Sequence, residues 1–255
     1  MLINSVPNAN GDPIGIEVGQ AAKPELPDSG MVLSGSLCRL EVLSAESHAQ
    51  DLFEAFSLDV SDSLWTYLPQ GPFQSVDEFA AWVERVQGQQ DPIFYAIIDE
   101  QTNRAVGVSA YLRIDQRASS IEIGWLTFSS LMQKKPIATE AMHLMMKNAF
   151  DLGYRRLEWK CNALNAPSIR AAARLGMSFE GVFRQATIVK GHSRDTAWFS
   201  LLDIEWPQVR SAIEAWLAEG NFDKAGNQKL RLSDLTLPLL ADSWPQITVK
   251  VSEQN

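Results

Sequence analysis

The sequence predicts an α/β (α+β) fold with a mixed, mostly antiparallel central sheet and flanking helices. Three strand-like segments follow one another with only short turns between them: Pro92–Asp99, Val106–Ile114 and Ser120–Phe128. Short turns join antiparallel strands, so these segments are expected to pair as neighbours. Helix-like and strand-like segments then alternate through residues 139–202, which is typical of a mixed sheet and not of a doubly wound one.

The chain is long enough for one substantial core. It has 255 residues, of which 45% are hydrophobic. Residues 1–30 show no sustained hydrophobic period and predict an irregular arm, residues 31–207 predict the main domain, and residues 208–255 predict a terminal helix and a tail. The tail holds one candidate edge strand, Ile247–Val251, and is expected to cover a sheet edge or to form a subunit contact, which leaves a homodimer open.

The first elements of the main domain follow from apolar residues and capping residues. Apolar positions within 37–42 predict the first strand. Ser44 opens a helix-start pattern that leads into the run AQDLFEAFSL. Ser75, with a glutamate three positions later, marks the start of a second helix that ends near residue 87. Between these helices, Leu64–Phe73 is rich in aromatic residues and proline and predicts a loop.

A third helix is predicted to open at Thr139 and to stop near Gly153. Its apolar residues recur at helical spacing on one face: Met142, Met145, Met146 and Ala149. The next helix is bounded by Asn165 as its cap, Pro167 in its first turn and Gly176 at its end. The remaining predicted elements are strands at Leu157–Asn162, Ser178–Val189 and Thr196–Leu202, and a helix at Pro207–Ala218.

Composition excludes several classes of protein. The isoelectric point of about 4.9 argues against sequence-independent nucleic-acid binding, and no apolar run approaches the roughly 18 residues of a membrane span. Without a secretory pattern, and with Cys38 and Cys161 expected to be buried free thiols, the chain is expected to be cytoplasmic. The spacing of the cysteines predicts no metal site. The three histidines, His48, His143 and His192, are expected to face solvent.

One segment carries a positive charge that the rest of the chain lacks. Residues 131–174 contain eight Lys or Arg and three acidic residues, whereas the whole chain has a net charge of −9. These cations lie at predicted strand-to-helix turns, where amide groups also favour anions. The segment therefore predicts an anion site, with a phosphorylated cofactor as the candidate ligand.

Four motifs in family order resemble the GNAT superfamily of acetyl-CoA-dependent N-acetyltransferases, and most of all its RimJ/RimL-type branch of ribosomal-protein N-terminal acetyltransferases. The resemblance covers residues 32–207. The motifs are the EIGW strand at 122–125, the loop at 133–138 that runs into an ATEA helix start, the N-x-x-S of Asn165 and Ser168, and the RLGM-x-F-E-G-type run that begins at Arg174.

The resemblance implies the GNAT fold, in which a pair of parallel strands is splayed apart. It also implies acetyl-CoA as a co-substrate and no metal. The residues expected by resemblance to hold the thioester, pantetheine and pyrophosphate are Trp125, Leu126, Thr127, Gln133, Lys134, Lys135, Ile137, Ala138, Thr139, Asn165 and Ser168.

The pyrophosphate loop departs from the family pattern at Pro136, where the family has glycine. Proline supplies no N–H, so one amide donor is missing, while the amides of Lys135, Ile137, Ala138 and Thr139 are expected to remain. Two interpretations follow: a modified cradle that still binds CoA, or a degenerate loop in a CoA-binding or interaction protein with little or no transferase activity. The turn is also one residue longer than usual, which leaves a different acyl donor open.

Ser168 and Glu122 are the candidate catalytic residues. In the family the amine attacks the thioester directly, so the site must accept one proton and stabilise a departing thiolate. By resemblance Ser168 would protonate that thiolate, or it would only satisfy a first-turn amide. Glu122, or Glu158 on the neighbouring strand, would accept the amine's proton through water, or would be a sheet-face charge paired with Lys160 or Arg156.

The expected reaction is acetylation of a primary amine, with the N-terminal α-amine of a protein or peptide first and a small amine second. An α-amine, with a pKa near 8, costs about 3 kcal/mol less to deprotonate at pH 7 than a lysine amine. A site without a strong base therefore suits the α-amine. Trp65, Tyr67 and Phe73 would form an aromatic wall of the acceptor pocket, or would pack their loop over the sheet.

Overall fold

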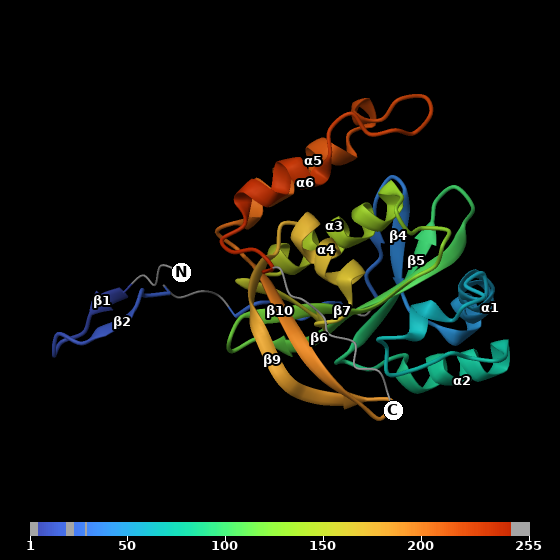
Figure 1. The fold of residues 1–255 in the computed structure, drawn as a ribbon, viewed down its shortest axis with the longest axis horizontal. Coiled ribbons are helices and arrows are strands. Elements are labelled where there is room, and N and C mark those ends of the chain that lie inside the picture. The colour runs from blue at the N-terminus through green and yellow to red at the C-terminus, as the bar shows by residue number, and fades with distance from the viewer. Residues whose placement is uncertain (1–4, 19–22, 29, 246–255) are drawn as a thin grey trace, which may run out of the picture.

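The computed structural model describes residues 5–18, 23–28 and 30–245. Its centre is an eight-stranded sheet in the order β3-β4-β5-β6-β7-β8-β10-β9 (Figure 1). Six of its neighbouring pairs are antiparallel and one pair, β7–β8, is parallel. The strands are β3 Leu33–Ser34, β4 Cys38–Val42, β5 Ile93–Asp99, β6 Arg104–Asp115, β7 Ser120–Phe128, β8 Arg156–Asn162, β9 Ser178–Val189 and β10 His192–Leu202. The mixed, mostly antiparallel sheet predicted from the sequence is confirmed.

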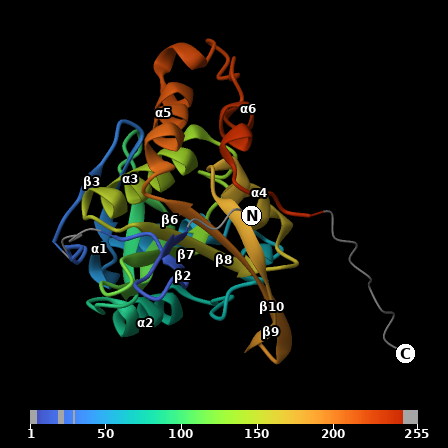
Figure 2. The same cartoon turned by 90° about the vertical axis from the view of Figure 1, so that its left-hand side faces the viewer.

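Helices cover both faces of the sheet. The two views place α3 and α4 on one face, with α5 and α6 outside them, and α1 and α2 on the opposite face (Figures 1 and 2). The helices are α1 Ala45–Phe56, α2 Val76–Val86, α3 Pro136–Asp151, α4 Ala166–Arg174, α5 Trp206–Leu217 and α6 Leu232–Thr236. None of the described helices is long and apolar enough to cross a membrane.

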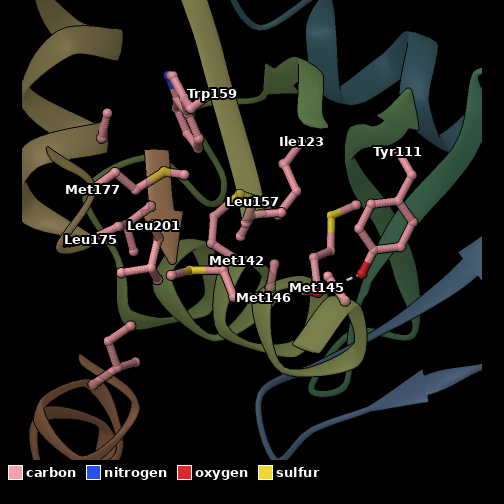
Figure 3. Packing of buried hydrophobic residues seen from close by; sticks show 14 of the residues in the cluster. Tyr111, Ile123, Met142, Met145, Met146, Leu157, Trp159, Leu175, Met177 and Leu201 are labelled. Atoms are coloured by element: carbon pink, nitrogen blue, oxygen red, sulfur yellow. Dashed lines mark hydrogen bonds between the residues drawn. The ribbon is translucent and has the colours of Figure 1, made fainter. Parts of the chain in front are cut away.

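Each face of the sheet has its own core. The methionines predicted to share one face of α3 do so: Met142, Met145 and Met146 point at the sheet, where the Tyr111 hydroxyl donates a hydrogen bond to the carbonyl of Met145 (Figure 3). On the opposite face, α1 and α2 enclose an aromatic cluster with the 3₁₀ turn Ser63–Trp65. The two cysteines predicted to be buried free thiols are both buried and free.

The capping residues predicted from the sequence perform that role. Ser44 and Ser75 accept hydrogen bonds from amides three residues later, at 3.4 and 3.2 Å. Asn165 caps α4 in the same way, at 3.2 Å. Gly176 ends that helix with φ +84°, and a β-carbon there would lie 2.8 Å from the Val209 side chain, so both the turn and the packing require glycine.

Helix α3 begins at Pro136, three residues before the predicted start at Thr139. Pro136 occupies the first helical position, where an N–H has no helical acceptor and a fixed φ suits the helix. From the sequence, Pro136 was expected in the loop before the helix, either in a modified cradle or in a degenerate one. The structure shows it as the first residue of the helix.

Glu140 on α3 holds the turn between the edge strands β3 and β4 in place. Its carboxylate is buried and accepts hydrogen bonds from the backbone N–H groups of Ser36, Leu37 and Cys38, at 3.0, 2.6 and 2.8 Å. Gly35 leaves room for this carboxylate, because a β-carbon there would lie 2.5 Å from Glu140 Oε2. The edge strands β3 and β4 are thereby tied to a helix about a hundred residues further along the chain.

The N-terminal arm differs from the irregular structure expected for it. The arm contains a hairpin of β1 Ser5–Pro7 and β2 Pro13–Gly15, which lies away from the main body (Figure 1). Its turn is stabilised by Asn8 Oδ1, which accepts two backbone hydrogen bonds at 2.9 Å, a local contact that hydrophobic periodicity does not report. The candidate strand Ile247–Val251 lies outside the described residues.

Two of the three histidines are buried, so the expectation that they face solvent was wrong for these two. His48 lies beneath the start of α1, where its Nδ1 accepts the amide of Ser44 at 3.0 Å. His143 lies on the helix face that packs against α5, with its ring 5.9 Å from that of Trp206. Both positions follow from tertiary packing of the helix faces that carry them. His192 is exposed, as expected.

Candidate active site

The parallel strands β7 and β8 pair only at their beginnings. Their register runs from Ser120 opposite Arg156 to Glu122 opposite Glu158 and then ends. Beyond this point β7 keeps its partner β6 on one side, while the backbone edge that faces β8 is left without strand pairing. A bulge with φ +55° at Trp125 interrupts the pairing with β6 at the same level. A cleft of about 1630 Å³ lies along this opening.

The cleft is strongly basic although the chain is acidic. Its described lining contains eight basic residues and one acidic residue, Glu122. The basic residues are Arg113, Lys134, Lys135, Lys160, Arg170, Arg174, Arg194 and Arg231. A concave surface with this excess attracts anions and suits a ligand that carries several phosphates. Five of the eight cations noted in residues 131–174 line this cleft: Lys134, Lys135, Lys160, Arg170 and Arg174.

The turn before α3 presents part of this charge. Lys134 adopts φ +59° and Lys135 precedes the first helical residue, and both side chains are exposed along the cleft. The amide of Lys135 donates to the carbonyl of Met132, and that of Ala138 to the carbonyl of Lys135, both at 3.2 Å. These two amides, expected to be free, are therefore engaged within the turn, whereas the amide of Ile137 has no such partner in the described part of the chain.

Arg174 extends the basic wall toward the C-terminal segment. Its guanidinium donates to Thr139 Oγ1 at 2.9 Å and stacks on the ring of Trp216, 4.7 Å from the ring centre. Burial lowers the pKa of Arg174, yet an arginine stays charged at neutral pH. The described residues provide no carboxylate within ion-pair distance, so this cation is available to a ligand.

The start of α4 places Ser168 against the inner wall of the cleft. Trp159 Nε1 donates to Ser168 Oγ at 3.0 Å, and the amide of Ser168 donates to Asn165 Oδ1 at 3.2 Å. Since the indole N–H uses the oxygen as an acceptor, the hydroxyl group acts as a donor on its other side. Burial raises the pKa of the Cys161 thiol to about 11, which a hydrogen bond with Ser168 partly offsets.

Glu122 and Glu158 belong to a network of ion pairs. Lys160 Nζ lies 3.0 Å from Glu122 and 2.6 Å from Glu158, and Arg113 lies 2.6 Å from Glu122. Arg156 lies 2.8 Å from Glu158. Burial opposes ionisation of Glu158, but the hydrogen bonds from Lys160 and Arg156 hold its pKa below the usual value. The pairing considered for these carboxylates in the sequence is therefore present.

Of the three aromatic residues expected to form the acceptor wall, one lines the cleft and two pack in the core. Tyr67 lines the cleft, and its hydroxyl donates to the carbonyl of Leu164 at 3.1 Å. Trp65 and Phe73 pack against each other beneath the loop, with ring centres 5.3 Å apart, and do not line the cleft. The backbone of Trp65 connects the loop to the turn between β9 and β10, because its carbonyl accepts a hydrogen bond from Lys190 at 2.8 Å.

Most of the predicted cofactor residues lie together along the cleft. Those that line it are Trp125, Leu126, Gln133, Lys134, Lys135, Ala138, Thr139, Asn165 and Ser168. Thr127 and Ile137 are buried and do not line it. Within the described ranges, no three His, Cys, Asp or Glu side chains converge as metal ligands would.

Sequence reasoning missed several lining residues. Arg113 pairs with Glu122 across the strands, and Arg194 and Trp198 line the cleft from β10. The C-terminal segment contributes another group: Trp216, Phe222, Gly226, Asn227, Gln228 and Arg231. No local pattern in the sequence reports these positions. Asp195, which follows Arg194 on β10, accepts the amide of Gln185 at 2.7 Å and forms no ion pair with Arg194 in the described part of the chain.

Comparisons with known proteins agree with this geometry. Residues 39–178 match the family model described as "Acetyltransferase (GNAT) domain". A GCN5-related N-acetyltransferase from Brucella melitensis is 43% identical, with a TM-score of 0.82, and the match covers 85% of this chain and 99% of that one. The uncharacterized N-acetyltransferase YnaD of Bacillus subtilis is 26% identical over 65% of this chain and 95% of its own length. The structure of RimL, a ribosomal L7/L12 α-N-protein acetyltransferase, has the same fold, with 21% identity over 68% of this chain and 94% of its own, and a TM-score of 0.57.

The family model spans more than half of the chain, and the Brucella structure matches the fold over most of it. The parted parallel strands, the basic turn before α3 and the capped start of α4 all lie within or beside the matched residues. The chain belongs to the GNAT family and is an acetyl-CoA-dependent N-acetyltransferase.

Proposed function

We propose that this enzyme acetylates the N-terminal α-amine of a protein or peptide. The observation that carries the proposal is the state of Glu122, which is the acidic residue of the cleft and is already paired with Arg113 and Lys160. The described lining of the cleft therefore offers one candidate carboxylate base, and its oxygens are already engaged in ion pairs. Such a site works best on an amine that is partly neutral at pH 7, as an α-amine is.

The open strand edge and the positive charge of the cleft support acetyl-CoA as its ligand. The unpaired edge of β7 offers backbone groups for the pantetheine arm, and the turn at Lys134 and Lys135 offers two cations beside the start of α3. Arg174 and Arg231 extend the positive surface for the remaining phosphates. Pro136 fits as well, since it sits in the helix where its missing N–H is not needed. When bound, acetyl-CoA supplies an acetyl group already activated as a thioester.

Each residue around the opening then has one role in the reaction. An amide of β7 near Trp125 donates to the oxygen that gains charge as the amine attacks. Glu122 accepts the amine's proton through water. Ser168 would donate its hydroxyl hydrogen to the departing thiolate and regain a proton from water, while the Trp159 indole holds its oxygen in place at 3.0 Å. Tyr67 and Lys190 hold the loop over the cleft through hydrogen bonds to backbone carbonyls.

The test begins with calorimetric titration of the full chain with acetyl-CoA and with CoA, for which we expect micromolar dissociation constants. Acetylation of a peptide with a free N-terminus is then compared with acetylation of the same peptide whose N-terminus is blocked and whose reactive amine is a lysine. We expect the α-amine to react faster by roughly two orders of magnitude at pH 7, from the difference in neutral fraction. Equal rates, or a faster lysine, would refute the assignment to α-amines.

A further inference from the structure

Arg194 occupies the acceptor side of the cleft. It pairs with Thr187 of β9, and the register between the two strands shifts immediately after it, before Thr196. Its side chain lines the same cleft as Glu122 and Lys160. Glu122 and Arg113 both act electrostatically on its guanidinium. The pyrophosphate turn at Lys134 and Lys135 has cations of its own, so Arg194 is not needed there.

The Arg194 side chain has no partner in the described structure. It makes no hydrogen bond and no ion pair with the described residues, and its Nε is sealed from solvent without an acceptor. On the same strand, Trp198 Nε1 is also buried without an acceptor. Buried donors in folded proteins are nearly always satisfied, so two such donors on one cleft wall require an explanation.

The neighbouring charges do not compensate Arg194, because they already compensate one another. The three cations Arg113, Lys160 and Arg156 form ion pairs with three carboxylates. Those carboxylates belong to Glu122, Glu158 and Glu180. Arg194 is therefore a positive charge in excess, and burial lowers its pKa without removing that charge at neutral pH. An unpaired, half-buried cation destabilises the fold, which favours a role in binding.

We propose that Arg194 binds a carboxylate of the acceptor, so that the substrate is a primary amine that carries a carboxylate close to the reacting nitrogen. A planar guanidinium matches a carboxylate in two parallel hydrogen bonds. Glu122 would then face the amine while Arg194 holds the acid. This inference rests on the proposed acetylation of an amine and specifies its acceptor.

Two sources can supply such a carboxylate. One is the α-carboxylate of a free amino acid, and the other is the side chain of an acidic first residue in a peptide. Matched acceptors separate them: alanine against alaninamide, and the amidated peptides Asp-Ala-Ala against Asn-Ala-Ala. Within each pair the reacting amine is an α-amine, and rates are compared at the same concentration of its neutral form.

The experiment measures kcat/KM for each acceptor with acetyl-CoA, using the full chain, Arg194→Gln and Arg184→Gln. Arg184 is an exposed residue of the same hairpin that does not line the cleft, so its variant is the matched control. In one of the two pairs we expect the carboxylate member to be preferred by roughly ten- to a hundred-fold. Arg194→Gln should abolish this preference, mainly through KM, and Arg184→Gln should keep it.

A second readout does not depend on turnover. Binding of N-acetylalanine is compared with that of N-acetylalaninamide, and binding of the acetylated Asp peptide with that of its Asn analogue, in the presence of CoA. A carboxylate preference that Arg194→Gln removes supports the inference even if no acceptor is acetylated. The lack of acetylation would then refute the proposed function alone. Acetylation of both members of each pair at equal rates overturns the inference and leaves the function standing.

Thermal unfolding distinguishes a binding role from a structural one. Because Arg194 has no partner in the described structure, Arg194→Gln should unfold at the wild-type temperature or above it. A clear fall in the unfolding temperature, relative to Arg184→Gln, would mean that Arg194 supports the fold, and would overturn its assignment as a ligand-binding residue.

Discussion

Replacing Lys160 by methionine tests whether the charges around Glu122 act as one network. The Lys160 side chain is 6% exposed, and its ammonium lies between the carboxylates of Glu122 and Glu158 at 3.0 and 2.6 Å. It also lies 3.6 Å above the ring of Trp198. Methionine keeps most of the length of the side chain and its contact with the ring, so the substitution removes mainly the charge.

The expected cost follows from this geometry. Removing one partner of a buried ion pair typically costs 3–5 kcal/mol, because the remaining charge is left without compensation. Here each carboxylate keeps an arginine, Arg113 or Arg156, so the lower end applies. We expect a loss of about 3 kcal/mol in the free energy of unfolding, or roughly 6–12 °C in the unfolding temperature for a chain of this size.

Urea and thermal unfolding of Lys160→Met are compared with Lys147→Met. Lys147 is 40% exposed and pairs with Asp151 on the surface of α3, so its replacement should cost less than about 1 kcal/mol. A second substitution, Glu158→Gln, should restore part of the stability of Lys160→Met by removing one of the two facing negative charges. If Lys160→Met loses no more than Lys147→Met, the cluster is not a buried network and the argument about Glu122 fails with it.

Four further predictions concern the site and the fold. Replacing Lys134 and Lys135 by glutamate should weaken CoA binding, more at low salt than at high salt, and unchanged titration curves would remove both residues from the site. Ser168→Ala should slow turnover at nearly unchanged acetyl-CoA affinity, whereas a wild-type rate would end its proposed role as an acid. Glu122→Gln should depress the rate mainly below the pKa of the amine; a loss that is uniform with pH, together with lower stability, would assign it to structure. Burial lowers the pKa of His143, so the stability that its neutral form contributes is lost as the pH falls below about 6.5. His143→Gln should flatten that loss in unfolding titrations, and an unchanged pH dependence would contradict it.

Local patterns in the sequence were sufficient for most of the fold. Strand β7 has the predicted bounds, and Ser75 and Asn165 cap the helices predicted to follow them. These features depend on contacts between residues a few positions apart, which a single sequence records directly. The start of α3 was misplaced because Pro136 was interpreted through its missing N–H, and not through the fixed φ that suits a first helical position.

The parts of the site that were missed depend on contacts between distant segments. Trp65 and Phe73 lie in the aromatic cluster because α1 and α2 enclose them, which their composition as a loop does not indicate. Arg194 is left without a charged partner because the charges on β6, β7 and β8 already pair with one another. The C-terminal segment reaches the cleft only through its packing on α4 and α5, so no motif marks Arg231.

The contact between Glu140 and the amides of residues 36–38 also bears on how the chain folds during synthesis. The carboxylate lies 102–104 positions after the amides it binds. At typical rates of translation, roughly 5–20 s pass before the ribosome has added that residue. Throughout this interval the amides that Glu140 later binds have only water as a partner, and the edge of the growing sheet stays open. We therefore expect nascent chains that stop before α3 to need chaperones, and the commitment of the first strands to the sheet to coincide with the emergence of that helix.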